Sequence, residues 1–280
     1  MKFTKMHGAG NDFILVNNFE EKIPEEKMGA IAARLCTRRL SIGADGMMFV
    51  CPPEEGTDFK MMFFNSDGTM GEMCGNGARC IARYGHDKGF SGDVQRFETT
   101  AGIVSGERID DRYYRVRLND ITKTAPAVPV AYEGKDYLCD YVELGDPGLP
   151  HIAVEMPGLS GLTKEDLRGL GEALRHAAVF PKGANVNFYE VTGEDRVLEL
   201  TYERGVEDFT LACGTGTGAV VSILTMKGKV SGKGTRVTVP GGELRIDAEK
   251  GEDGRIKAIY LTGPTNVVSE GEVRDEDLEI

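Results

Sequence analysis

Two cysteine–glycine stretches, half a chain apart, contain the residues best suited to chemistry. Residues 73–79 read Met-Cys-Gly-Asn-Gly-Ala-Arg, and residues 212–219 read Ala-Cys-Gly-Thr-Gly-Thr-Gly-Ala. Glycine lets successive backbone N–H groups point into a concave site, so a thiol placed there borders an anion-binding pocket rather than a core. The pattern predicts that Cys74 and Cys213 act on one substrate.

Each of these cysteines directly precedes a predicted helix start. The helix dipole and the free N–H groups there stabilise a thiolate and can lower the pKa to roughly 3.5–7.5. The same N–H groups can bind a carboxylate, which would place a substrate α-carbon between the two sulfurs. One thiolate would remove a proton and the opposite thiol would return one to the other face, which inverts the stereocentre without a cofactor.

The remaining cysteines and glycines have simpler interpretations. Cys36, Cys51, Cys80 and Cys139 are expected to be small buried hydrophobes. The glycines at 214–218 superficially suggest a phosphate loop, but no Gly-Lys-Ser/Thr follows, and Ala219 stands where a dinucleotide fingerprint requires glycine. Catalysis by one cysteine with His151 is a further alternative, and it leaves the second cysteine stretch unexplained.

The composition of the chain argues against a nucleic-acid-binding protein and against a membrane protein. The chain has 280 residues, and 45 acidic against 33 basic residues give a net charge of −12, so the charge expected of a nucleic-acid binder is missing. No stretch approaches the ~18 apolar residues needed to cross a bilayer, and no leader is evident, which predicts a cytoplasmic protein. The six cysteines lack the spacing of a zinc site, so no metal is predicted.

Local patterns predict an alternation of strands and helices. Helices are expected from Pro24, after Cys74, from the capping box Thr163-x-x-Asp166, and after Cys213, where an apolar surface nearly all round predicts a central helix. Residues 123–129 are expected to be a linker and residues 270–280 an acidic tail. Strands are predicted at 13–16, 47–50, 59–64, 95–100, 103–109, 113–118, 137–144, 152–156, 186–191, 197–202, 236–239, 244–248 and 256–261.

Matched spacings indicate an internal duplication. The distance from helix start to cysteine is 74 − 24 = 50 residues in the first half and 213 − 163 = 50 in the second. The predicted fold is therefore α/β (α+β), with two pseudo-symmetric domains that each wrap a mixed or antiparallel sheet around a central helix. The domains are expected at 1–120, joined by 264–280, and at 121–263, with the active site in the cleft between them.

The sequence resembles the diaminopimelate epimerase family over most of its length. The resemblance rests on motifs that occur in order along the chain: His7–Phe13, Gly43–Gly46, Asn65–Gly68, Met73–Arg79, Glu203–Gly205 and Ala212–Gly216. It implies an isomerase that inverts one stereocentre of L,L-diaminopimelate with two cysteines and no pyridoxal phosphate or other cofactor. It also implies a homodimer that serves lysine and cell-wall synthesis.

The resemblance assigns roles residue by residue. Cys74 and Cys213 are the acid–base pair, and His151 and Glu203 tune the ionisation of the thiols. Glu203 is also counted among the substrate-binding residues. Gly75 and Asn76 with Gly214 and Thr215 would cradle the reacting amino-acid end. The distal end of the substrate would be held by Asn11, Asn65, Asn185 and Arg204.

Two other functions remain open. Many family members read Gly-Asn-Pro-His where this chain has Gly148-Leu149-Pro150-His151, so Leu149 replaces a distal polar contact. A racemase of another amino acid, such as histidine, on the same fold is therefore the first alternative. Proline racemases resemble the family but have histidine at the position of Asn76. The asparagine of this chain therefore argues against proline as the substrate. The second alternative is a non-catalytic ligand-binding or redox protein.

Overall fold

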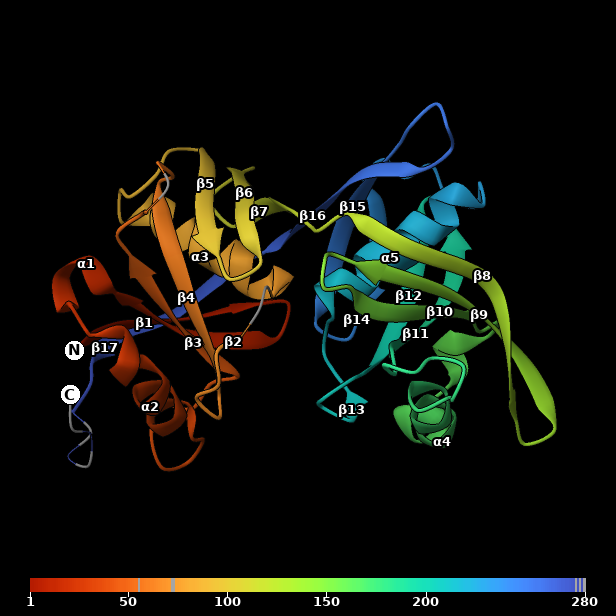
Figure 1. Ribbon diagram of the computed structural model, residues 1–280, viewed down its shortest axis with the longest axis horizontal. Helices are drawn as coiled ribbons and strands as arrows, with labels where there is room; N and C mark the ends of the chain where they lie inside the picture. The colour runs from red at the N-terminus through yellow and green to blue at the C-terminus, as the bar shows by residue number, and fades with distance from the viewer. Residues whose placement is uncertain (55, 72–73, 275, 277, 279–280) are drawn as a thin grey trace. The chain divides into compact units, whose positions relative to one another are not determined.

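The computed structural model describes residues 1–54, 56–71, 74–274, 276 and 278. The chain divides into two units, of which the first joins Met1–Val116 to Thr262–Ile280 and the second is Arg117–Leu261. Both ends of the chain belong to the first unit (Figure 1). Met73 of the first cysteine stretch lies outside the described residues, as do four residues of the expected acidic tail, at 275, 277 and 279–280.

The first unit is one mixed sheet with helices on both faces. Its strand order is β17-β1-β2-β3-β4-β5-β6-β7, in which β2–β3 and β4–β5 are parallel and the other pairs are antiparallel. Its elements are β1 (Lys2–Gly8), β2 (Asn11–Asn17), α1 (Asn18–Glu21), α2 (Glu25–Cys36), β3 (Gly46–Cys51), β4 (Phe59–Asn65), α3 (Gly75–Asp87), β5 (Val94–Thr99), β6 (Gly102–Arg108), β7 (Tyr113–Arg117) and β17 (Asn266–Glu272).

Helix α3 is the buried helix of this unit. It contacts β1, β2, β3 and β6, and nearly all of its first eleven residues are buried. Such a close fit requires small residues, because a Cβ atom on Gly8 of β1 would lie 2.9 Å from the backbone oxygen of Asn76 in α3. The other long helix, α2, is amphipathic and covers β3 and β4 with Met28, Ile31 and Leu35.

The second unit has a sheet of the same kind. Its strand order is β8-β9-β10-β11-β12-β14-β15, with β10–β11 and β12–β14 parallel and the other pairs antiparallel. Its elements are β8 (Ile121–Tyr132), β9 (Lys135–Leu144), β10 (Leu149–Glu155), the 3₁₀ turn η1 (Leu159–Gly161), α4 (Lys164–Arg175), β11 (Asn185–Gly193), β12 (Arg196–Glu203), β13 (Asp208–Phe209), α5 (Gly214–Met226), β14 (Thr235–Val239), β15 (Gly242–Lys250) and β16 (Ile256–Pro264), whose last residues enter the first unit.

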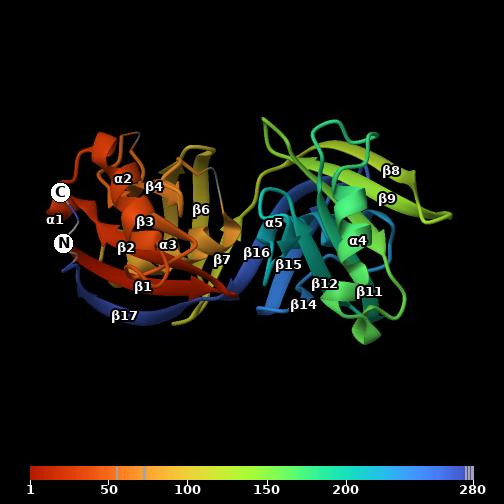
Figure 2. The ribbon, with the colours of Figure 1, turned by 90° about the horizontal axis from the view of Figure 1, so that it is seen from below.

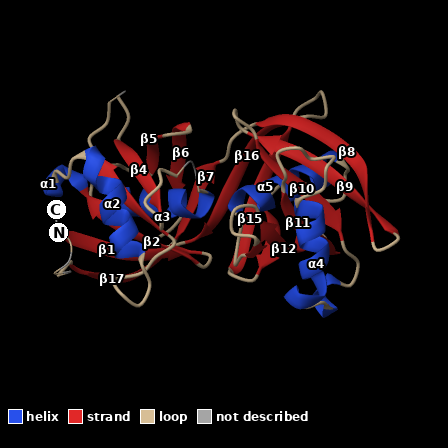
Figure 3. Ribbon diagram, turned by 60° about the horizontal axis from the view of Figure 1, so that its bottom comes forward, coloured by secondary structure: helices blue, strands red, loops and turns tan. Residues whose placement is uncertain are grey.

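Helix α5 is buried in the second unit as α3 is in the first. It contacts β9, β10, β11 and β15, and its residues are almost all buried, which confirms the predicted central helix. Helix α4 lies over β11 and β12 (Figure 3) and packs Leu167, Leu170 and Leu174 into a cluster with the outer face of the sheet. The predicted capping box at its start, formed by Thr163 and Asp166, is confirmed.

The two units share one topology, so the predicted duplication is confirmed. In each unit an outer helix joins the first parallel pair of strands and the buried helix joins the second. The helix caps agree with the sequence spacing: Pro24 and Cys74 cap α2 and α3, and Thr163 and Cys213 cap α4 and α5. Both intervals are 50 residues, so the spacing seen in the sequence is the distance between the N-caps of the outer helix and the buried helix in each copy of the duplicated unit.

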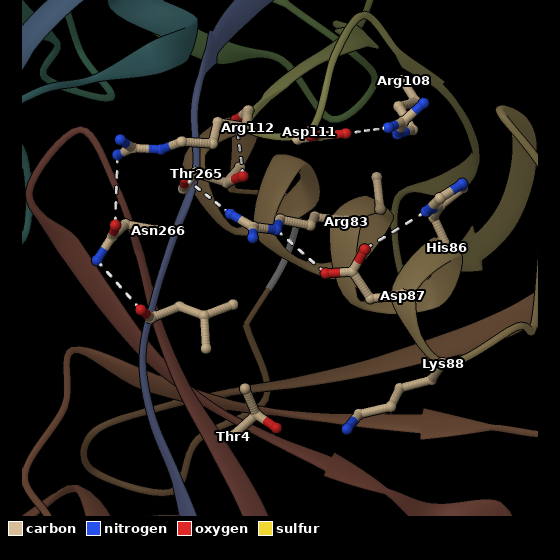
Figure 4. Close-up of polar contacts among 12 residues, drawn as sticks. Thr4, Arg83, His86, Asp87, Lys88, Arg108, Asp111, Arg112, Thr265 and Asn266 are labelled. Carbon is tan, nitrogen blue, oxygen red and sulfur yellow. Dashed lines mark hydrogen bonds and ion pairs between the residues drawn. The ribbon is translucent and has the colours of Figure 1, made fainter.

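Strand β17 completes the first unit from the far end of the chain. It pairs with β1 from Lys2 opposite Glu272 to His7 opposite Asn266, and the two strands lie side by side in Figure 2. Arg83 of α3 donates to the backbone oxygen of Thr265 and to Asp87, and the backbone N–H and hydroxyl of Thr265 donate to the carbonyl of Arg112 (Figure 4). These contacts fix the returning segment to the helix that begins at Cys74.

Two local predictions were wrong. Residues 123–129, expected to be a linker, belong to β8, which accepts Pro126 and Pro129 because it is an edge strand with a bulge between Ala125 and Val128. The expected acidic tail begins inside β17, which runs to Glu272. No helix among the described residues is long and apolar enough to cross a membrane.

The capping box predicts a measurable loss of stability. Thr163→Ala removes the hydroxyl that accepts from the Asp166 N–H, so we expect it to destabilise the second unit by about 1 kcal/mol. Urea unfolding followed by circular dichroism measures the change. Thr163→Asp keeps a capping oxygen and serves as the matched control, and equal losses in the two variants would contradict the capping role.

Candidate active site

In the first unit, three adjacent strands bring predicted site residues to one end of the sheet. Asn11 begins β2, Gly46 begins β3, and Asn65 ends β4 opposite Gly46. Asn11 accepts a hydrogen bond of 2.6 Å from the side-chain amide of Asn76, so these two predicted residues are in contact. Asn65 donates instead to the hydroxyl of Thr69 in the following turn.

Cys74 occupies the N-cap of α3 and is half-buried, while Gly75 and Asn76 form the first turn of that helix and are buried. Directly behind this turn lies Arg79, whose side chain is fully buried. Its guanidinium donates to the backbone oxygen of Gly75 and to the side-chain oxygen of Asn76. Burial lowers the pKa of Arg79 to about 10, and the charges of Cys80 and Cys74 oppose that shift. The first turn of α3 thus has a buried cation behind it.

In the second unit, the equivalent strand ends hold another set of predicted residues. His151 of β10 is opposite Asn185 at the start of β11, and β12 ends at Glu203, next to Arg204. The Asn185 side chain joins these ends, because it donates to the oxygen of Pro150 and accepts from the backbone N–H of Arg204 at 2.8 Å. The Arg204 guanidinium donates to the backbone oxygen of Lys182.

Cys213 occupies the N-cap of α5 and is buried. Its sulfur lies 3.6 Å from the hydroxyl of Thr215 and also accepts from the backbone N–H of Gly216. Burial raises the pKa of Cys213 well above its ordinary value, and the Glu203 charge raises it further, while the Thr215 and Gly216 donors oppose the shift. Burial therefore outweighs the stabilisation of a thiolate by the helix start. The prediction of a lowered pKa at Cys213 was wrong.

His151 of β10 is fully buried. Neither ring nitrogen has a hydrogen-bond partner among the described residues, and burial, assisted by the Arg204 charge, lowers the pKa of His151 to about 3. The ring is therefore neutral in the folded protein near pH 7. The other four cysteines are buried as predicted, and burial raises the pKa of Cys80 to about 12.

Sequence reasoning missed three polar residues behind the cysteine turns. Arg79 stood in the first motif without a role, and Glu199 and Thr217 were not singled out. Glu199 lies on the same face of β12 as the buried residues Val197 and Thr201, so an acid at an inward position of the strand was the available signal. Among the described residues, no group of three or more His, Cys, Asp or Glu side chains could hold a metal ion.

Comparison with known proteins identifies the family. The family model described as "Diaminopimelate epimerase" matches residues 3–119 and 145–268. The chain belongs to the diaminopimelate epimerase family. It is 35% identical to the diaminopimelate epimerase of Aquifex aeolicus over all of both chains, and 37% identical to that of Archaeoglobus fulgidus over 99% of this chain and 97% of the relative.

Solved structures share the fold of this family member at low sequence identity. A PhzF-family phenazine biosynthesis protein of Bacillus anthracis gives a TM-score of 0.73 at 15% identity, covering 98% of both chains. A probable proline racemase of Agrobacterium radiobacter K84 gives 0.69 at 16% identity, covering 97% of this chain and 92% of its own. These likenesses confirm the predicted fold class.

The enclosed imidazole of His151 predicts a pH-dependent stability. An unfolded chain protonates this residue near pH 6.5, whereas the folded protein holds it neutral until about pH 3. Its contribution is therefore complete above pH 6.5 and is lost as the pH falls from 6.5 towards 3, by about 1.4 kcal/mol per pH unit.

Unfolding free energies measured between pH 7 and pH 5 should show that slope in the native chain and a shallower one in His151→Leu. The difference between the two slopes gives the contribution of His151, because the other titrating groups are common to both chains. Equal slopes in the native chain and His151→Leu would contradict an enclosed neutral ring.

Proposed function

We propose that this enzyme interconverts L,L- and meso-diaminopimelate by moving the proton of one α-carbon between Cys74 and Cys213. The observation that supports it most is the duplication. Each unit places one cysteine at the N-cap of its buried helix, in a chain that belongs to this family. Inversion of a carbon needs one proton-transfer group on each face, and a duplicated fold supplies two equivalent groups.

In this proposal, the reacting amino-acid end binds at the two helix starts. Their first-turn N–H groups have no partners within the helix and favour a carboxylate. Gly75 and Asn76 of α3 and Gly214 and Thr215 of α5 provide these groups. As the α-proton leaves, negative charge moves onto the carboxylate, and the same donors stabilise it more strongly in the transition state.

The proton balance needs the two cysteines in different states. The thiolate takes the α-proton from one face and becomes a thiol, while the opposite thiol gives its proton to the other face and becomes a thiolate. One proton leaves the carbon and one is added, so no redox step and no cofactor are required. The reverse reaction exchanges the two roles.

Polar residues at the strand ends would select the substrate's distal end. Asn11 and Asn65 are contributed by the first unit, and Asn185, Glu203 and Arg204 by the second. A second zwitterionic amino-acid centre, as in diaminopimelate, needs donors for its carboxylate and an acceptor for its ammonium. Arg204 suits the carboxylate and Glu203 the ammonium, and Glu203 and His151 would also tune the thiols.

The family also suggests the setting of this activity. We infer a homodimer that works in the cytoplasm in the biosynthesis of lysine and of the cell wall. A racemase of another amino acid is the second candidate, and Leu149 favours it, because a leucine begins β10 where many members have asparagine. Incubating a panel of amino acids in D₂O separates the two, since faster α-deuteration of another amino acid than of diaminopimelate would reject the main assignment.

We expect that replacing either Cys74 or Cys213 abolishes most of the epimerisation activity. A serine hydroxyl is far harder to ionise than a thiol, so Cys74→Ser and Cys213→Ser should each lower kcat by at least about 100-fold. The measurement is conversion of L,L- to meso-diaminopimelate by chiral chromatography. Cys139→Ser, at a buried cysteine of β9, is the matched control and should retain activity. Normal rates in both single variants would eliminate the two-cysteine mechanism.

A further inference from the structure

Glu199 is a buried acid that the proposed reaction does not use. It lies in the middle of β12, and its side chain is fully enclosed. One carboxyl oxygen is 2.6 Å from the hydroxyl of Thr217, and the other has no hydrogen-bond partner in the residues that the structure describes. No cation within the described part of the chain pairs with it. An ionised carboxylate in such surroundings is costly, so the position favours the neutral acid.

Thr217 connects this acid to the cysteine turn. It lies one helical turn after Cys213, and its hydroxyl oxygen is 3.1 Å from the Cys213 carbonyl oxygen as well as 2.6 Å from Glu199. A hydroxyl has one proton to donate, and a carbonyl can only accept. Both contacts are hydrogen bonds only if Glu199 carries a proton and donates it to Thr217, which then donates to Cys213.

The other groups around Glu199 do not supply a counter-charge. On α5 the nearest titratable group is Cys213 itself, and on β11 the residue opposite Glu199 is Tyr189. Glu203 lies further along β12. Strand β10, on the far side of β11, contributes two groups: His151 is neutral, and Glu155 is paired with Lys229. The buried residues of β14 and β15 cannot carry a charge; they are Thr235, Val237, Val239, Leu244, Ile246 and Ala248.

We propose that Glu199 is a positioning residue that, through Thr217 and through its own buried charge, keeps Cys213 as the proton-bearing thiol of the pair. The inference rests on the proposed two-cysteine function. Near neutral pH the protonated Glu199 completes the chain of donors that ends at the Cys213 carbonyl and holds the first turn of α5. At higher pH its ionised form opposes a second negative charge, because the Glu199 charge acts on the Cys213 thiol.

The order of ionisation follows from the same contacts. Burial raises the pKa of Glu199 to about 8, and the Glu199 charge is among the causes that raise the pKa of Cys213. Two interacting groups of this kind titrate together, and the first to ionise delays the second. Glu199 therefore loses its proton first, and the thiol of Cys213 persists to higher pH than it would beside a neutral residue.

Infrared spectroscopy of the unmodified protein tests the protonation state directly. We expect a protonated-carboxyl band at pH 6.5 that disappears as the pH rises to 10 and that is absent from Glu199→Gln at both pH values. The amide of the variant keeps the volume and a donor for Thr217 but cannot ionise. A native chain without this band at pH 6.5 would overturn the proposal.

The pH profile of Cys213 alkylation tests the effect on the thiol. Iodoacetamide reacts with the thiolate, and mass spectrometry of the peptide that contains Cys213 gives its rate without any reference to turnover. Glu199→Gln should move the midpoint about one pH unit lower, which is about a tenfold faster reaction on the rising part of the profile. Glu155→Gln, at an exposed acid of β10, is the matched control and should leave the profile in place.

Glu199→Leu, which needs no hydrogen-bond partner, is the second variant and should give the same shift if the glutamine variant does not fold. Unchanged profiles in the folded variants would overturn the role of Glu199. The proposed function fails separately, if Cys213→Ser retains full epimerase activity. A shifted alkylation profile in a chain without epimerase activity would leave the inference about the thiol standing and remove only its catalytic purpose.

Discussion

A helix enclosed by a sheet depends on close backbone contact, and this constraint governs both units. Helices α3 and α5 fit only because their first turns consist of glycine and other small residues; a Cβ on Gly216 would lie 2.2 Å from the Asn187 side-chain oxygen. Glycine at these positions adds no side chain of its own over the first-turn N–H groups, which favour anions. The packing requirement and the chemistry of the cysteine turns therefore have one origin.

Duplication copied the backbone of the site but not its charges. The first turn of α3 has the buried guanidinium of Arg79 behind it, hydrogen-bonded to Gly75 and Asn76. The first turn of α5 has the Thr217 hydroxyl and the buried acid Glu199 in its surroundings. Two equivalent cysteines thus lie in electrostatically different environments. Different environments are what a pair needs if one member is to start as a base and the other as an acid.

Elements with a clear periodic pattern could be predicted from the sequence, and elements held by distant partners could not. The buried helices and the cap at Thr163 follow from local residues. Strand β1 was missed because its buried residues include Thr4 and Lys5, and Lys5 forms an ion pair of 2.8 Å with Asp12. Strand β8 was taken for a linker because its prolines are acceptable only at an edge. The raised pKa of Cys213 could not be predicted from the sequence, because its causes, burial and the charge of Glu203, depend on the tertiary structure.

Strand β17 has a consequence for how the chain is made. Residues 266–272 pair with residues 2–7, so the sheet of the first unit lacks its outer strand until residues 266–272 have left the ribosome. The second unit, at 117–261, is continuous in sequence and can close first. The half that is synthesised first is therefore the half that is completed last, and until then β1 presents an unpaired edge of the kind that invites association between chains.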